Sequence, residues 1–171
     1  ADANHWTELI SLNKISPEHL APHISRSMAI KNEVVTKDFK EENIRKILNF
    51  GHTIGHAVES LFLQKGNLIP HGEAVALGMI CETHLAFLSG LITVDDSSTI
   101  ITKIQRFFPY IDISEFKNED VINLMFNDKK NLDGNINFSL IDAVGSCTFD
   151  QKLNTEQINL TLEFYKNMHN S

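Results

Sequence analysis

The sequence predicts a mainly α-helical domain that carries one small β-hairpin near its C-terminus. Apolar residues recur at the three- and four-residue spacing of helices through most of the chain. Alternation with a period of two comes late, at Ile136, Phe138 and Leu140. The 171 residues contain no internal repeat and no linker long enough to separate two domains, so we expect a single domain over residues 1–171.

The first helices are marked by start signals. Residues Trp6–Leu12 form an amphipathic pattern that predicts a short helix. Ser16–Glu18 places a capping serine, a proline and an acid in the order typical of a helix start. We expect Pro22 to break this first turn and the helix to restart and run to about Val35. The restarted helix is expected to face the core with Ile24, Met28 and Ile30.

A longer helix is expected from about Asn43 to Phe62. Its apolar stripe consists of Ile44, Ile47, Leu48, Ile54, Val58 and Leu61. Further helices are expected over about 71–89, 95–108, 119–127 and 155–168, with the hairpin between the last two. The longest apolar tract, residues 74–92, carries Glu82 and His84, which predicts a buried helix and not a membrane span.

Charge, cysteine content and the N-terminal sequence limit the class of protein. Fifteen Lys and Arg against 22 Asp and Glu give a net charge of −7, which argues against a broad nucleic-acid-binding surface. Cys81 and Cys147 lack metal-type spacing, so we expect reduced thiols in a cytoplasmic protein. The N-terminus has no signal-peptide pattern. Because the chain does not begin with Met, we expect it to have been cut from a longer protein.

Three histidines form the pattern that carries chemical information. His52 and His56 are four residues apart on an expected helix, so their imidazoles share one face, and His71 stands at an expected helix start. Neutral imidazole is a common metal ligand, and a catalytic zinc usually takes three protein ligands. No partnering carboxylate is evident. Spacing alone favours His52 and His56 as ligands, and the alternative is one capping histidine with the others bonded in the core.

Two glycines accompany these histidines. Gly51 and Gly55 each precede a histidine inside the expected helix. A glycine there costs about 1 kcal/mol relative to alanine. We therefore expect another part of the molecule to approach the backbone closely at these positions.

Polar residues upstream suggest a groove for a hydroxylated, anionic substrate. Arg45 and Asn49 are four residues apart, and Glu41 lies one turn before Arg45. Lys31 adds a second cation. Each of these residues has the alternative of a solvated charge or a surface ion pair. The lysines of Asp128–Asn131 either bind phosphate or stabilise a helix C-terminus.

At these residues the sequence resembles the 3-dehydroquinate synthase family of sugar-phosphate cyclases. The likeness rests on five blocks in the family's order, which together are far more specific than any single motif. The blocks are Lys-x-x-Val-Val from Lys31, Glu-x-x-x-Arg from Glu41, Leu48–His56, His71–Met79 and Asp128–Asn131.

The resemblance implies a zinc-dependent or cobalt-dependent enzyme that uses NAD. It would convert 3-deoxy-D-arabino-heptulosonate 7-phosphate, a phosphorylated sugar acid, to 3-dehydroquinate and phosphate in aromatic amino acid biosynthesis. It implies His52 and His71 as metal ligands, with His56 and Glu41 as catalytic residues, which differs from the assignment by spacing. It also implies a homodimer. The substrate-binding positions it implies are Lys31, Arg45, Asn49 and Lys130.

Two parts of the family pattern are absent from the sequence. The family's third zinc ligand, a glutamate, would precede residue 1, and no glycine-rich nucleotide-binding motif occurs. We therefore expect the chain to be the helical C-terminal domain without its NAD-binding domain, and to be inactive alone. The alternatives are a related cyclase, a metal-dependent alcohol or glycerol dehydrogenase domain, and a non-catalytic metal-binding or partner-binding module.

Overall fold

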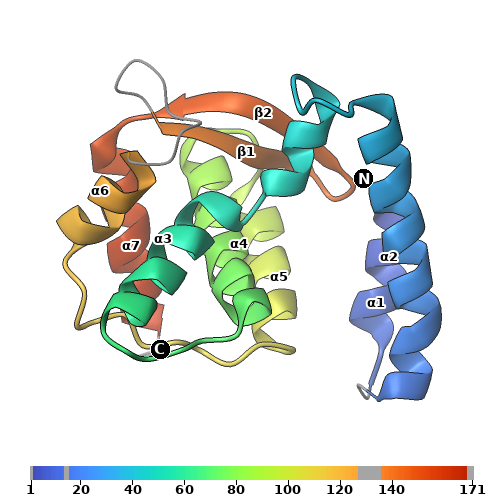
Figure 1. Cartoon of the computed structure of the whole chain (residues 1–171), viewed down its shortest axis with the longest axis horizontal. Coiled ribbons are helices and arrows are strands. Elements are labelled where there is room, and N and C mark those ends of the chain that lie inside the picture. Colours follow the sequence, from blue (N-terminus) through green and yellow to red (C-terminus); the bar gives the residue numbers. More distant parts are fainter. Residues whose placement is uncertain (1, 14–15, 127–135, 169–171) are drawn as a thin grey trace.

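The computed structural model describes residues 2–13, 16–126 and 136–168, and within them it confirms a mainly helical chain with one antiparallel hairpin. Figure 1 shows two N-terminal helices standing beside a helical body that the hairpin covers at one end. The helices are α1 (Ala3–Ser11), α2 (Pro17–Lys37), η1 (Ile44–Asn49), α3 (His52–Gln64), α4 (His71–Leu88), α5 (Val94–Gln105), α6 (Asn118–Phe126) and α7 (Thr155–Asn167). The strands are β1 (Ile136–Ala143) and β2 (Ser146–Leu153).

Helix α2 confirms its start signal but not the expected interruption. Ser16 caps the helix and Pro17 takes its first position. The predicted break at Pro22 was wrong, because α2 runs through it without interruption. A proline this early in a helix removes one backbone N–H, and Pro22 and the residue four before it are both exposed, so water can replace the lost partner.

The expected core stripe of α2 was also wrong. Ile24 is 54% exposed and Met28 is 67% exposed, while Ile30 is half-buried. Val34 is the side chain of α2 that is buried. The reason is the position of α2 at one side of the molecule, where among the described residues it packs against α1 and η1 (Figure 1).

The expected helix over residues 43–62 is two elements. Residues 44–49 form the short 3₁₀ helix η1, and α3 begins only at His52. The break falls at Gly51, whose φ of +83° lies in the left-handed region that favours glycine. The apolar spacing continues across the break, so periodicity alone does not reveal it.

Helix α4 lies at the centre of the hydrophobic core. It packs against α3, α5, α7 and β1. Its buried side chains include Leu77, Ile80 and Leu85, as the long apolar tract predicts. None of the helices in the described residues is long and apolar enough to cross a bilayer. Cys81 is buried in α4, Cys147 is half-buried in β2, and neither forms a disulfide.

The hairpin confirms the late period-two pattern and braces the chain before α3. Ile136, Phe138 and Leu140 are buried, and β1 pairs with β2 in antiparallel register. The Ser139 hydroxyl donates to the backbone carbonyl of Lys46 at 2.7 Å. The Lys46 Nζ lies 2.7 Å from Asp150 Oδ2. These contacts attach η1 to the sheet and so position the segment that leads to His52.

Candidate metal and substrate site

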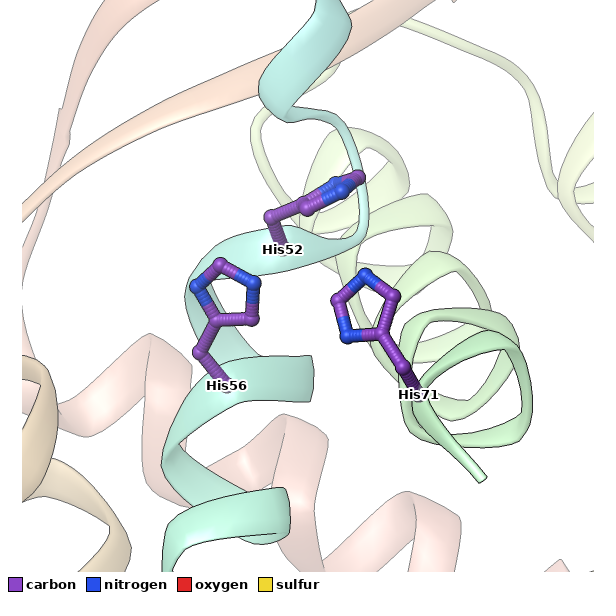
Figure 2. A group of neighbouring side chains, drawn as sticks. All are labelled: His52, His56 and His71. Atoms are coloured by element: carbon purple, nitrogen blue, oxygen red, sulfur yellow. The ribbon is translucent and has the colours of Figure 1, made fainter.

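The structure brings the three histidines together. His52 is the first residue of α3, His56 follows one turn later, and His71 is the first residue of α4. Ring centroids lie 5.2 Å apart for His52 and His56, 5.7 Å for His52 and His71, and 5.5 Å for His56 and His71. Figure 2 shows the rings facing one another between the starts of the two helices. One nitrogen from each ring lies within 4.8 Å of the others.

Glycines allow α3 and α4 to approach closely enough for this convergence. A Cβ at Gly55 would lie 2.8 Å from the carbonyl oxygen of Ala74, and a Cβ at Gly78 would overlap the carbonyl oxygen of Gly51. Only residues without a side chain permit these backbone contacts. The close approach expected from Gly51 and Gly55 is confirmed, and the approaching element is α4.

Buried Glu82 holds the N-terminus of α3 in place. Its side chain is fully buried in α4 and accepts three backbone N–H groups, from Gly51 at 2.5 Å, Thr53 at 3.0 Å and Ile54 at 3.2 Å. Burial raises the pKa of Glu82 to about 8, although the three N–H donors act in the opposite direction. The sequence showed only an acid inside an apolar helix, and this residue's role in orienting the start of α3 was missed.

A carboxylate partner for the histidines exists, contrary to expectation. Glu59 Oε2 lies 3.2 Å from His71 Nδ1. Glu59 is three residues after His56 on α3, so helical spacing places both on the same side. A carboxylate at Nδ1 fixes the imidazole tautomer and leaves Nε2 available for a metal. Glu59 lies seven residues, about two helical turns, after His52. This spacing was the sequence signal that could have identified Glu59 as a partner of the histidines.

Glu41, Arg45 and Asn49 form one polar group. Asn49 Nδ2 donates to Glu41 Oε1 at 2.8 Å, and Arg45 Nε lies 3.7 Å from Glu41 Oε2. Glu41 is not one turn earlier on the same helix, because it lies in the bend before η1 with φ at +60°. The Arg45 guanidinium also donates to the carbonyl of Phe39 at 2.8 Å. The three predicted residues therefore meet through an irregular segment.

Two further predicted residues are Lys31 and Lys130. Lys31 is exposed on α2 and lines a cavity of about 300 Å³ with residues that include Leu48, Phe50 and Met79. Lys130 falls outside the described residues. The roles predicted for Lys31, Lys130 and the polar group of Glu41, Arg45 and Asn49 stay predictions, as does the division of the histidines into ligands and a catalytic residue.

The donor set of the three histidines suits a divalent transition-metal ion. Imidazole nitrogens are ligands for Zn²⁺ and for its neighbours in the first row. The three rings come from two helix starts, are half-buried or exposed, and stand beside a carboxylate that can orient one of them. This arrangement leaves room for further ligands from outside the cluster.

Comparison with known sequences assigns the chain to a family. Residues 1–131 match the model of the 3-dehydroquinate synthase C-terminal family. The 3-dehydroquinate synthase of Parabacteroides distasonis is 36% identical over 160 residues, which are 92% of this chain and 45% of that protein. The enzyme of Caldanaerobacter subterraneus subsp. tengcongensis is 42% identical over 132 residues, 77% of this chain and 36% of that protein. The chain thus spans less than half the length of these relatives.

Solved structures give the same result for the fold. A 2-deoxy-scyllo-inosose synthase, complexed with carbaglucose-6-phosphate, NAD⁺ and Co²⁺, matches with a TM-score of 0.73 at 26% identity, over 89% of this chain and 42% of that one. ValA, a 2-epi-5-epi-valiolone synthase from Streptomyces hygroscopicus subsp. jinggangensis with NAD⁺ and Zn²⁺ bound, matches in fold with a TM-score of 0.72 at 20% identity, over 95% and 43%. This chain belongs to the 3-dehydroquinate synthase C-terminal family.

Proposed function

We propose that this chain is the metal- and substrate-binding half of a 3-dehydroquinate synthase, which converts 3-deoxy-D-arabino-heptulosonate 7-phosphate to 3-dehydroquinate and phosphate. The observation that carries the proposal is the convergence of His52, His56 and His71 within the part of the chain that matches the family. The curated relatives bear this enzyme's name. Catalysis is assigned to the whole protein, and we expect the 171-residue chain to be inactive alone.

His52 and His71 are proposed to hold the metal. Each is the first residue of its helix, and the glycine contacts of α3 with α4 keep those two starts together. Glu59 orients the His71 ring. A bound Zn²⁺ or Co²⁺ ion would supply Lewis-acid polarisation, and NAD would supply reversible hydride transfer. The two solved cyclases contain NAD⁺ with Co²⁺ or Zn²⁺.

His56 is proposed to move protons at the substrate. Its ring is exposed and lies beside the two proposed ligands, where a bound substrate can reach it. Loss of phosphate requires removal of a proton from the carbon next to the one that carries the leaving group, and imidazole can accept or return a proton near neutral pH. Arg45 and Asn49 are proposed to hold the substrate's polar groups, with Glu41 as the second catalytic residue, because the three side chains are already ordered by mutual contacts.

The proposal is tested by phosphate release from 3-deoxy-D-arabino-heptulosonate 7-phosphate, with the whole protein of the source gene. His56→Ala should keep zinc and lower kcat by about 10²- to 10⁴-fold, the range for loss of a general acid or base. His52→Ala and His71→Ala should each lose the zinc ion held at this cluster, whereas His19→Ala on α2 should change neither quantity. Full zinc in the His52→Ala and His71→Ala proteins, or an active His56→Ala protein, would reject these roles.

The same assay separates the alternatives. Release of phosphate from a hexose 6-phosphate, but not from the sugar acid, would indicate a related cyclase. Such a result is worth testing because a solved neighbour binds carbaglucose-6-phosphate. Oxidation of glycerol without phosphate release would indicate a dehydrogenase. A whole protein that binds zinc but transforms none of these compounds would indicate a non-catalytic module.

A further inference from the structure

A second group of metal-ligating side chains lies between α1 and α2, the two N-terminal helices that stand side by side in Figure 1. It consists of His5 and Glu8 from α1 and His23 from α2, each with one donor atom within 4.8 Å of the others. The His5 and His23 ring centroids are 5.5 Å apart. No residue of this group belongs to the cluster of His52, His56 and His71.

His5 is the observation that points to a ligand. Its side chain is only 7% exposed, and its Nδ1 is buried without a hydrogen-bond partner. The other ring nitrogen, Nε2, lies 2.9 Å from the hydroxyl oxygen of Ser27. A buried polar atom without a partner costs about 1–3 kcal/mol, so a histidine in this state is unfavourable unless something binds it.

The hydrogen bond of His5 occupies one ring nitrogen and leaves the other available. If Nε2–H donates to the Ser27 hydroxyl, Nδ1 carries the lone pair that a metal needs. Metal-bound histidines usually donate their second ring nitrogen to such an outer partner. Ser27 is four residues after His23 on α2, so the helix that supplies the second imidazole also supplies this partner.

The two helices are already held in the arrangement that the group requires. His5 and Glu8 are three residues apart on α1 and therefore share a face. Arg26 of α2 pairs with Asp2, the cap of α1, at 2.7 Å. The group therefore joins α1 to α2. Helix α2 buries only Val34 among its own side chains, so it has little apolar packing to hold it.

We propose that His5, Glu8 and His23 bind a divalent transition-metal ion, with Zn²⁺ as the best match, at a site separate from the catalytic one. Two imidazole nitrogens and a carboxylate oxygen form a zinc donor set that leaves a fourth position for water. The ion satisfies the buried Nδ1 of His5 and ties α1 to α2. Its binding does not depend on the reaction proposed above.

The test uses the chain with His52→Ala and His71→Ala, which removes the proposed catalytic ligands. Equilibrium dialysis against Zn²⁺ with metal analysis should find one ion per chain. Adding His23→Ala should weaken that binding by at least about tenfold, since loss of an outer partner alone typically costs 10- to 100-fold. Adding Glu8→Gln should weaken it as well. His19→Ala removes an exposed histidine of α2 outside the group and should leave binding unchanged.

A Co²⁺ spectrum and a thermal midpoint test the same site independently of dialysis. Co²⁺ should give a visible absorption spectrum that His23→Ala abolishes and His19→Ala retains. Zn²⁺ should raise the thermal midpoint of the background protein but not that of the protein with His23→Ala. His23 and Glu8 are not fully buried, so circular dichroism should show that both variants fold. Absence of Zn²⁺ binding in the background protein, or equal binding after His23→Ala, would overturn the proposal.

Discussion

Glu82 makes the stability of this protein depend on pH. Its carboxyl is fully buried, and that burial raises its pKa from 4.5 to about 8. An acid whose pKa is higher in the folded state binds its proton more tightly there than in the unfolded chain. Glu82 therefore stabilises the folded state at low pH. This contribution is lost as the pH rises from about 4.5 to about 8, and above pH 8 the free energy of unfolding no longer changes through Glu82.

The size of the effect follows from the same two pKa values. Linkage at about 1.4 kcal/mol for each tenfold change in proton affinity gives an upper limit on the order of 5 kcal/mol. Glu82→Gln removes the titration. One amide oxygen can still accept from Thr53 and Ile54, but the amide NH₂ then faces the N–H of Gly51. The N–H of Gly51 and the new NH₂ group then both lack an acceptor, which should lower the free energy of unfolding by at least about 1–3 kcal/mol at low pH.

The assay is urea unfolding of both proteins from pH 5 to pH 9 with EDTA present, so that metal binding does not contribute. The stability of the natural protein minus that of Glu82→Gln should decrease across this range. Subtraction removes the titration of every other group that the two proteins share. A difference that stays constant from pH 5 to pH 9 would refute the reasoning, because it would mean that the three N–H donors keep Glu82 ionised in the folded state across this range despite its burial.

Two further predictions concern the contacts that shape the histidine cluster. Gly78→Ala forces a Cβ against the Gly51 carbonyl, so it should lower the free energy of unfolding by about 1–3 kcal/mol or more and weaken Zn²⁺ binding. The control is Gly72→Ala on the same helix, whose Cβ would meet nothing within 4 Å and which should change neither quantity. Urea unfolding and Zn²⁺ titration measure both, and equal behaviour of the two variants would contradict the helix contact. Glu59→Gln should keep the Zn²⁺ stoichiometry but lower the affinity by about 10- to 100-fold, while Glu156→Gln on α7 should leave it unchanged. Unchanged affinity in Glu59→Gln would show that this carboxylate does not orient His71.

Local sequence signals predicted most helix starts, because caps and breakers act over a few residues. Ser16 and Pro17 begin α2 as expected, and α3 ends at Gln64, two residues after the expected Phe62. The errors arose where a local rule competed with tertiary context. Pro22 remained inside a helix because its exposed surroundings tolerate one missing N–H. Gly51 broke a helix whose apolar period continued, because α4 occupies the space beside it.

The site was predictable where its residues lie on one helix or carry a recognisable pattern. The spacing of His52 and His56 placed both on one face, and the start signal at His71 located the third ring. Glu82 was not predictable in the same way, because its partners are backbone groups about thirty residues away in sequence. Backbone N–H groups leave no mark on a sequence. Only the packing of α3 on α4 reveals which backbone N–H groups the buried Glu82 accepts.

The positions of the histidines follow from backbone contacts more than from their own side chains. His52 and His71 are each the first residue of a helix, so they meet only if the two helix starts meet. Small residues at Gly55 and Gly78 let the helices approach, and Glu82 then fixes the start of α3 from within α4. Rings that are half-buried or exposed gain less from packing than buried ones and cannot hold this arrangement themselves. Substitutions in the buried contact should therefore impair metal binding even though they touch no ligand.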